Sequence, residues 1–319
     1  MTTILTAETG REAWLAARRK GIGASEIAAV LGISPWESPF SLYWRKVNGW
    51  DYEPSAEMEW GTRLEPAIAA KYADAHPDVY VETGQLAVSG YGSWMLATPD
   101  RLIGPACQHP SGNMYQNHCC DCMNTGMAGP PEAVLELKTA HSADGWGEPD
   151  TAEIPVYYRA QVQWQMLVLG VQYAELAVLI GGSDYREYRV RRDDKDIAVM
   201  VEHGRRFMAR IEAGDPPPLD DHHATVTTLK RLHPDLTDDA PAEVPADLAA
   251  GVRRARHMKA LSEALCDRYE ARLRDAMGSA RRAVSGGVAV ASRSIYDVAE
   301  SMRRGYTVDK LNYPRSPKP

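Results

Sequence analysis

Val134-Leu135-Glu136-Leu137-Lys138-Thr139 predicts a β-strand, because the stretch is apolar and β-branched apart from its two charged residues. Side chains alternate along a strand with period two, so Glu136 and Lys138 share one face and Leu137 points to the other. The stretch therefore predicts a strand of a buried sheet that holds a carboxylate and an ammonium group side by side.

The segments around this strand predict a mixture of helices and strands. Apolar spacing predicts helices over 25–31, 38–48, 57–75, 156–170 and 194–213. Strands are predicted over 79–88, 93–97, 174–180 and 185–191, and the last of these pairs with the one before it. This order is typical of an α/β sheet with helices on both faces.

Proline-rich segments divide the chain. Pro216-Pro217-Pro218 stops the preceding helical pattern, and the Pro/Asp-rich run 233–245 predicts a linker. Beyond it, apolar residues that step by three and four predict a long helix over 248–278, and Gly286-Gly287 predicts a short hairpin over 283–290. The expected organisation is a domain over 1–232, a linker over 233–245 and a helical appendage with a hairpin over 246–319.

The composition of the 319 residues is that of a globular protein, with 36 Lys+Arg, 43 Asp+Glu and a net charge of −7. The stretch 253–304 is locally basic, with a charge of +6. It predicts either a nucleic-acid or partner surface or a solvated basic helix. No apolar run approaches the roughly 20 residues that span a bilayer, and the first ten residues lack a signal-peptide pattern, so we expect a cytoplasmic protein without membrane contact.

Glu136 and Lys138 suit phosphodiester hydrolysis. A carboxylate binds a hard divalent cation, and a lysine orients and deprotonates the attacking water and stabilises charge on the phosphate. Two further acids accompany this pair: Asp100 in Ala97-Thr98-Pro99-Asp100, and Glu65 on the helix over 57–75. Each motif alone also has a structural explanation. Glu136 and Lys138 could form a surface ion pair, Asp100 could be a turn residue, and Glu65 could be a surface glutamate of its helix.

Two other motifs are polar in a regular pattern. Gln161 and Gln165 lie at i, i+4 on one face of a predicted helix, opposite Gln163. The segment Arg18-Arg19-Lys20-Gly21-Ile22-Gly23-Ala24-Ser25 places basic residues before a glycine turn that opens a helix. The turn predicts either a phosphate pocket or plain helix capping.

Taken in order, these motifs resemble the lambda-exonuclease or YqaJ-type viral recombinase family of the PD-(D/E)xK nuclease superfamily, over about residues 11–215. The resemblance implies an α/β fold: a three-layer α/β/α restriction-endonuclease-like core with a mixed sheet, followed here by the C-terminal helix and hairpin. It implies 5′ to 3′ digestion of one strand of linear duplex DNA for recombination by strand annealing. The alternatives are an endonuclease of the same superfamily and a DNA-end-binding protein without turnover.

The resemblance also implies the ligands and partners. The substrate would be double-stranded DNA ends, with a single-strand annealing protein as partner and a ring-forming homotrimer as assembly, in the host cytoplasm if the gene is viral. The cofactor would be Mg²⁺ or Mn²⁺, as two ions. By this resemblance, Asp100 and Glu136 match the metal ligands, with the Leu137 carbonyl beside them, and Glu65 matches the ligand of the second ion. Lys138 matches the residue that activates water, and Gln161 matches the residue that orients it. The positions that bind the 5′-phosphate are matched by Arg18, Ser25 and Thr98, and Arg19 could replace Arg18 after a small shift.

The sequence departs from the family in an insertion over about 104–131, between Asp100 and Glu136. The insertion contains four of the five cysteines, which in a reducing compartment points to a metal before a disulfide. We expect one structural zinc, since thiolates and imidazoles are its usual ligands. An unligated thiol-rich loop is the alternative, and an iron–sulfur cluster fits less well. The expected ligands are Cys107, His109, Cys119 and Cys122, with His118 or Cys120 as substitutes.

Overall fold

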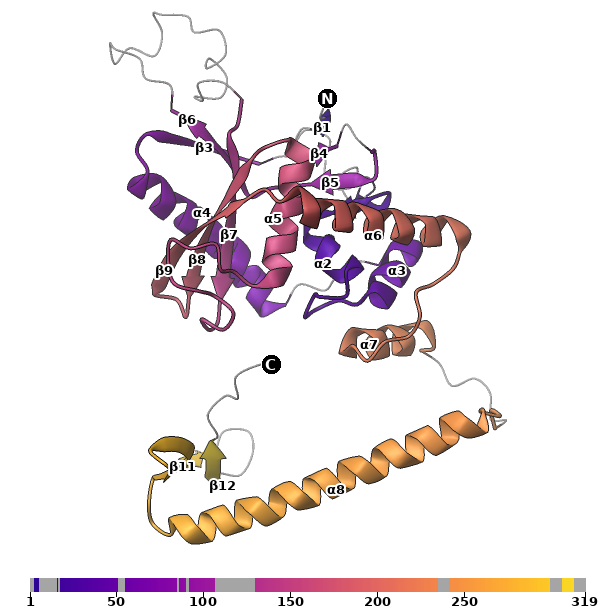
Figure 1. Ribbon diagram of the computed structural model, residues 1–319, viewed down its shortest axis with the longest axis vertical. Helices are drawn as coiled ribbons and strands as arrows, with labels where there is room; N and C mark the ends of the chain where they lie inside the picture. Colours follow the sequence, from indigo (N-terminus) through magenta and orange to yellow (C-terminus); the bar gives the residue numbers. More distant parts are fainter. Residues whose placement is uncertain are drawn as a thin grey trace, which may run out of the picture. The chain divides into compact units, whose positions relative to one another are not determined.

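The computed structural model describes residues 3–5, 16, 18–50, 55–84, 86–89, 92–106, 130–234, 241–298 and 306–312 (Figure 1). The chain forms two compact units, Met1–Asp235 and Leu236–Pro319, and each is described by itself.

A five-stranded mixed sheet forms the centre of the first unit. Its strand order is β3-β6-β7-β8-β9. The strands are β3 (Val79–Thr83), β6 (Arg101–Pro105), β7 (Ala133–Ala140), β8 (Tyr173–Ile180) and β9 (Asp184–Arg191). Strands β7 and β8 are parallel and the other neighbours are antiparallel. Parallel neighbours need a crossover, and helix α5 (Val156–Leu169) lies between β7 and β8 in the chain.

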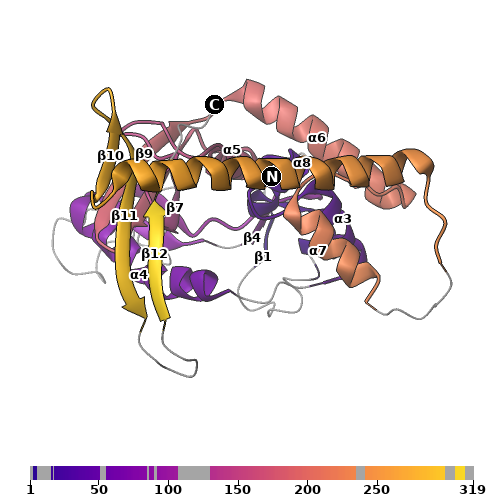
Figure 2. The ribbon, with the colours of Figure 1, turned by 90° about the horizontal axis from the view of Figure 1, so that it is seen from below.

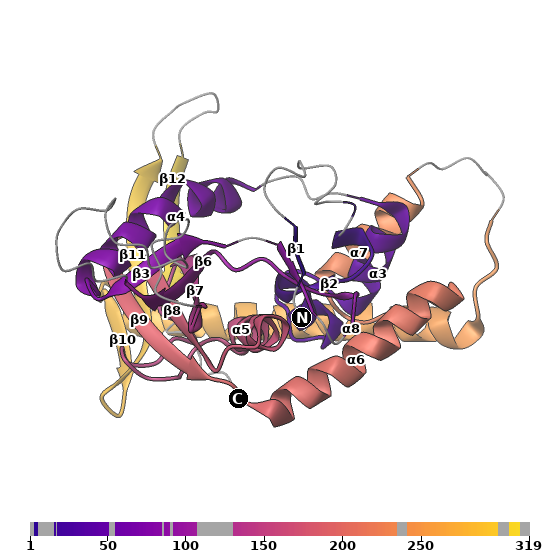
Figure 3. The same ribbon diagram turned by 90° about the horizontal axis from the view of Figure 1, so that it is seen from above.

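Two helices cover the faces of this sheet, as Figure 3 shows. Helix α4 (Ala56–Ala75) packs Ile68 and Tyr72 in the buried cluster that contains Leu135 and Leu137. Helix α5 packs on the other face, where Val162 belongs to the cluster of alternate residues of β7 and β8. The predicted three-layer α/β/α core with a mixed sheet is confirmed, and so is the alternation that sets Leu137 apart from Glu136 and Lys138.

A second sheet has the order β1-β4-β5-β2. It contains β1 (Thr3–Leu5), β4 (Leu86–Val88), β5 (Met95–Ala97) and β2 (Ile22–Gly23). The prediction of one strand over 79–88 is therefore wrong, because β3 and β4 belong to different sheets. Gly84 marks the break: a Cβ atom there would lie 1.9 Å from the carbonyl oxygen of Pro99, so only glycine allows the two backbones this close.

Within the described residues, further helices of this unit are the short helix η2 (Ala24–Glu26), α2 (Ile27–Val30), α3 (Pro39–Asn48), α6 (Asp194–Ala213) and α7 (His223–Leu232). Of these, η2, α2, α3 and α6 contribute side chains to a buried core that contains Trp164. The sequence predicted α3 and α6 within one or two residues at their ends. It missed α7, because the threonines of this helix have a low helix propensity. It also missed β6, because this strand ends in Gly104-Pro105, and both residues are unfavourable within strands.

The second unit is a long helix followed by three antiparallel strands (Figure 2). They are α8 (Ala246–Met277), β10 (Arg282–Ser285), β11 (Val288–Val298) and β12 (Tyr306–Asn312). The predicted hairpin is confirmed, with Gly286 and Gly287 both at positive φ, and it is extended by a third strand. Most of the apolar stripe of α8 is exposed, whereas Met277 at the end of the helix is buried. At least half of the surface is exposed at Leu248, Val252, Met258, Leu261, Leu265 and Tyr269.

In the part of the chain that the structure describes, no helix combines the length and the apolar character that crossing a bilayer requires.

Candidate active site

A cavity of about 300 Å³ lies where β7, α5, η2 and the β5–β6 connection meet. Besides the backbone of the glycine turn and three apolar residues, it is lined by most of the residues predicted from the sequence. These are Arg18, Ser25, Thr98, Asp100, Glu136, Lys138 and Gln161. The fold therefore brings together residues that are spread over more than 140 positions of the chain.

Asp100 lies where the chain passes from the second sheet to the central sheet. Because Arg101 pairs with Leu135 in the antiparallel ladder, the preceding residue, Asp100, comes next to Glu136. Asp100 Oδ2 accepts a hydrogen bond of 2.8 Å from the backbone N–H of Leu137. The bond fixes this carboxylate against β7, beside the charged face of that strand.

Glu136 is almost fully buried, with 1% of its surface exposed, and every donor that contacts it is a side-chain nitrogen. Oε1 accepts from Lys138 Nζ and Gln161 Nε2, and Oε2 accepts from Gln165 Nε2 at 2.7 Å. Burial, and then repulsion from Asp100, raise the pKa of Glu136 to about 7, although Lys138 opposes them. Burial alone would lower the pKa of Lys138, but the two carboxylates raise it overall. Lys138 is thus held as an ammonium ion.

The pair Asp100 and Glu136 fits a hard divalent cation. Burial and, after it, repulsion from Asp100 raise the pKa of Glu136, and a divalent cation held by the two carboxylates would offset both. A carboxylate offers about four lone pairs, so the hydrogen bonds described above leave acceptor capacity on both groups. Among the described residues no three His, Cys, Asp or Glu side chains are grouped to hold a metal. Two carboxylates completed by water and substrate phosphate suit Mg²⁺, which rarely uses an all-protein cage.

The three glutamines of α5 divide between two tasks. Gln161 and Gln165 both reach Glu136, whereas Gln163 points the other way. Gln163 Nε2 donates to the carbonyl of Arg191 at 2.7 Å, and its Oε1 accepts from the N–H of Asp193 at 2.9 Å. Their predicted division between two helix faces is confirmed. Sequence reasoning assigned no role to Gln165, although its i, i+4 spacing from Gln161 indicates that both side chains face Glu136.

Arg18 forms the other side of the cavity. Its Nη2 donates to Ser25 Oγ at 3.2 Å and lies 4.0 Å from Glu26 Oε1. Thr98 also lines the cavity. Arg19 does not line it, because its guanidinium group lies beside Gly49, 3.5 Å from the position that a Cβ atom on that glycine would take. Of the two arginines that the sequence left open, Arg18 is the one at the cavity.

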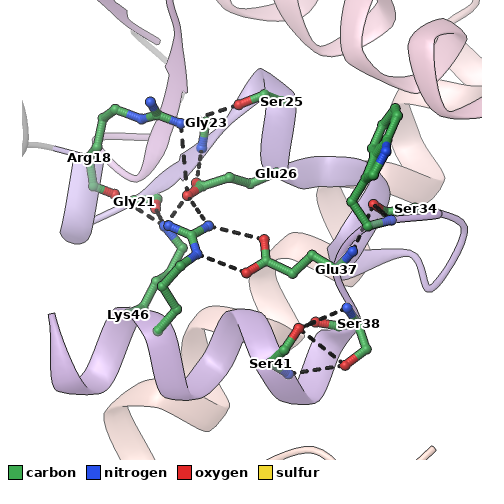
Figure 4. Close-up of polar contacts among 12 residues, drawn as sticks. Arg18, Gly21, Gly23, Ser25, Glu26, Ser34, Glu37, Ser38, Ser41 and Lys46 are labelled. Atoms are coloured by element: carbon green, nitrogen blue, oxygen red, sulfur yellow. Dashed lines mark hydrogen bonds and ion pairs between the residues drawn. The ribbon is translucent and has the colours of Figure 1, made fainter. Parts of the chain in front are cut away.

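A buried ionic cluster supports this turn, and Figure 4 shows Glu26 at its centre. Glu26 Oε2 accepts from the N–H of Gly23 and from Lys46 Nζ, both at 2.8 Å, and Oε1 accepts from Arg45 Nη2 at 2.8 Å. Lys46 Nζ also donates to the carbonyls of Gly21 at 2.6 Å and Arg18 at 3.1 Å. Helix α3 thus fixes the backbone that presents Arg18 and Ser25.

The charges of this cluster act on each other strongly. Burial alone would raise the pKa of Glu26, but Lys46, Arg45 and Arg18 outweigh it and hold the pKa at about 2. Burial lowers the pKa of Lys46, although Glu26 opposes the shift. Sequence reasoning missed the cluster, because the partners of Glu26 lie 19 and 20 positions away on a different helix.

Glu65 is held at the edge of the site rather than inside the cavity. Arg101 Nη1 donates at 2.6 Å both to Glu65 Oε1 and to the carbonyl of Asp100. Glu65 is not among the residues that line the cavity. Its role at a second metal ion stays a prediction.

The predicted zinc ligands lie outside the described residues. These are Cys107, His109, Cys119 and Cys122, with His118 and Cys120 as substitutes.

Comparison with known proteins places this site in a family. The sequence profile of the YqaJ-like viral recombinase domain matches residues 13–172, which include every lining residue of the cavity. Uncharacterized protein YqaJ of Bacillus subtilis (strain 168) is 29% identical over 253 residues, which are 75% of this chain and 68% of that protein.

The chain is also similar to solved structures of two exonucleases. The alkaline exonuclease LHK-Exo from Laribacter hongkongensis is 22% identical, with a TM-score of 0.46 over 70% of this chain and 98% of that one. A phage-related exonuclease from Haemophilus somnus 129PT is 9% identical, with a TM-score of 0.41 over 60% of this chain and 94% of that one.

Proposed function

Because the chain belongs to the YqaJ-like viral recombinase domain family, we propose that it is a divalent-metal-dependent deoxyribonuclease that digests one strand of linear duplex DNA from the 5′ end. One observation carries the proposal. A single cavity is lined by two carboxylates and a lysine and also by an arginine and two hydroxyl side chains. The first group suits a scissile phosphate with a metal, and the second suits a terminal phosphate.

Each side chain has a defined task in this proposal. Asp100 and Glu136 would hold Mg²⁺ or Mn²⁺, with Glu65 at the edge of the site as the ligand of a second ion. The metal, when bound, lowers the pKa of water and stabilises charge on the phosphate. Lys138, held as an ammonium ion, orients the attacking water and neutralises charge that develops on the phosphate oxygens. Gln161 and Gln165 fix Glu136 in place through their N–H groups.

The Arg18 side of the cavity favours an exonuclease over an endonuclease. A guanidinium with a neighbouring hydroxyl binds a terminal phosphate dianion more strongly than an internal phosphodiester, which carries one charge. An enzyme with such a site is expected to start at a free 5′ end. Degradation of one strand would produce the single strand that an annealing protein uses in recombination, and we propose this role and this partner on the same basis.

Two other functions use the same fold. An endonuclease of the superfamily would cut covalently closed circles, and a DNA-end-binding protein would bind without turnover. The presence of Asp100, Glu136 and Lys138 in one cavity favours turnover.

A comparison of substrates and metals tests the proposal. We expect cleavage of linear duplex with Mg²⁺, none with chelator, and none of covalently closed circles. Glu136→Gln, Asp100→Asn and Lys138→Met should each lower the rate at least about 100-fold, because each removes a charge that acts in the transition state. Glu212→Gln, on the exposed surface of α6, is the matched control and should keep the activity. Cleavage of closed circles would favour the endonuclease, and tight end binding without cleavage would favour the binding protein.

A further inference from the structure

Trp36 lies in the loop between α2 and α3, and 57% of its surface is exposed. Exposure alone would need no explanation, since single apolar residues are common on protein surfaces. The loop, however, is held firmly. The backbone N–H groups of Trp36 and Glu37 both donate to Ser34 Oγ at 3.2 Å. Glu37 accepts two hydrogen bonds from Arg45, at 2.8 and 3.1 Å; Figure 4 shows Ser34 and Glu37 in this network. The indole is therefore presented to solvent on a fixed backbone.

Trp36 is part of an aromatic group at the start of α5, which we name the aromatic platform: Trp36, Tyr157 and Tyr158. The ring of Trp36 lies 4.9 Å from that of Tyr157 and 5.9 Å from that of Tyr158, and the two tyrosines are 4.6 Å apart. Tyr158 in turn packs against the buried Trp146 at 5.6 Å. The platform thus has one exposed ring, Trp36, supported by two tyrosine rings, of which Tyr158 packs against the core.

The platform contacts the cavity through Lys138 and is connected to Arg18 through an ionic network. Lys138 Nζ lies 5.2 Å from the centre of the Tyr158 ring, so Tyr158 borders the side that would bind the scissile phosphate. On the other side, Glu37 and Glu26 both bind Arg45, and Glu26 lies against Arg18. The loop that carries Trp36 is therefore connected to the side that would bind the terminal phosphate.

We propose that the aromatic platform stacks on the base of the terminal nucleotide of the strand that is cleaved. The inference rests on the proposed function, in which this nucleotide lies between a terminal phosphate at Arg18 and a scissile phosphate at Lys138. With both phosphates bound in one cavity, we expect this base to leave its stacked and paired position in the duplex. An exposed indole backed by a second ring gives it a replacement surface, and stacking of this kind tolerates every base sequence.

The fluorescent base 2-aminopurine tests the proposal, because its emission falls when it stacks on an aromatic ring. The probes are 5′-phosphorylated duplexes with 2-aminopurine at the 5′-terminal nucleotide, at the opposite 3′ terminus or well inside the duplex. Ca²⁺ replaces Mg²⁺ so that the strands stay intact, which a denaturing gel verifies. We expect quenching by the protein at the 5′-terminal position only.

Variants at two exposed tryptophans separate this role from a general effect. Trp36→Ala should lose most of the quenching and bind the duplex about tenfold more weakly, and Trp36→Phe should keep much of both. Trp60, which is 62% exposed on α4, is the control, and Trp60→Ala should behave as the unchanged protein. Thermal unfolding verifies that each variant is folded.

The outcomes distinguish this inference from the function on which it rests. Full quenching by Trp36→Ala, an equal loss in Trp60→Ala, or quenching at the 3′ terminus instead would overturn the platform and leave the nuclease proposal in place. Failure of the unchanged protein to bind duplex ends at all would overturn both.

Discussion

Glu26 is a single residue on which the turn that carries Arg18 and Ser25 depends. Its pKa in the folded protein is about 2, below the ordinary 4.5, because three cations surround it. A carboxyl with a lowered pKa stabilises the fold above its unfolded pKa, and the contribution is lost as the pH falls from about 4.5 toward about 2. A shift of this size corresponds to about 3 kcal/mol at neutral pH.

We therefore expect Glu26→Gln to lower the free energy of unfolding by about 3 kcal/mol at pH 7, with a smaller difference at pH 3. Urea denaturation of both proteins at the two pH values measures it. Glu202→Gln, whose carboxylate pairs only with exposed arginines of α6, should show little change at either pH. An equal loss at pH 7 and pH 3 would show that the charge of Glu26 is not what stabilises the turn.

Arg18 and Arg19 are adjacent, but only Arg18 lines the cavity. The unchanged protein should digest a 5′-phosphorylated end faster than a 5′-hydroxyl end, because charge-assisted hydrogen bonds form only with the phosphate. Arg18→Ala should remove this preference by slowing the phosphorylated substrate about tenfold or more, whereas Arg19→Ala should keep it. Initial rates on the two ends measure the effect. Equal rates on both ends in the unchanged protein would leave Ser25 without a phosphate-binding role.

At the scale of one element, α5 combines a structural and a functional face. Gln163 joins α5 to the end of β9 and the start of α6 by two hydrogen bonds, and Gln161 contacts Glu136 in the cavity. We expect Gln163→Leu to lower the free energy of unfolding by about 1 to 2 kcal/mol, since it removes two part-buried hydrogen bonds made by a buried side chain. Gln161→Leu should lower the rate of hydrolysis with little loss of stability. Thermal unfolding and single-turnover rates of both variants test this, and a reversed pattern would contradict it.

The elements also show how far the sequence predicts the structure. Strand β7 and helices α4, α5 and α6 follow from local periodicity, and the alternation around Leu137 gave the charged face of β7. The β3–β4 break could not be predicted, because it depends on the approach of Gly84 to Pro99, a contact between segments that lie apart in the chain. The pairing of Glu26 with Arg45 and Lys46 depends in the same way on how α3 packs, which no local pattern contains.

The insertion between β6 and β7 makes a separate prediction from its sequence. If Cys107, His109, Cys119 and Cys122 bind one zinc, protein purified under reducing conditions without chelator should keep about one zinc per chain after dialysis against Mg²⁺. Cys119→Ser combined with Cys122→Ser should remove the zinc, and Cys266→Ser, a change at the exposed cysteine of α8, should not. Elemental analysis measures this. A protein without zinc or iron would leave these residues as a thiol-rich loop.

At the scale of the whole molecule, the charge is divided unevenly between the parts of the chain. Residues 1–252 carry −15, whereas 253–304 carry +6. The acidic groups attract a divalent cation, but they also repel a DNA backbone, so the opposing field must come from Arg18 in the cavity and from the basic stretch 253–304, which includes most of α8. All residues that line the cavity belong to the first unit.

We therefore expect a chain that ends at Pro245 to keep single-turnover cleavage at saturating DNA and to bind DNA more weakly. The loss of affinity should be large at low salt and small at high salt, because a basic segment binds phosphates by releasing counterions. A full-length variant with Arg253, Arg254 and Arg256 all changed to Gln is the matched control, since it keeps α8 and removes only charge. If α8 contributes to binding through its charge, this variant should show part of the same loss of DNA affinity at low salt. A shortened chain that is folded by thermal unfolding yet lacks single-turnover cleavage would show that the second unit takes part in the hydrolysis itself.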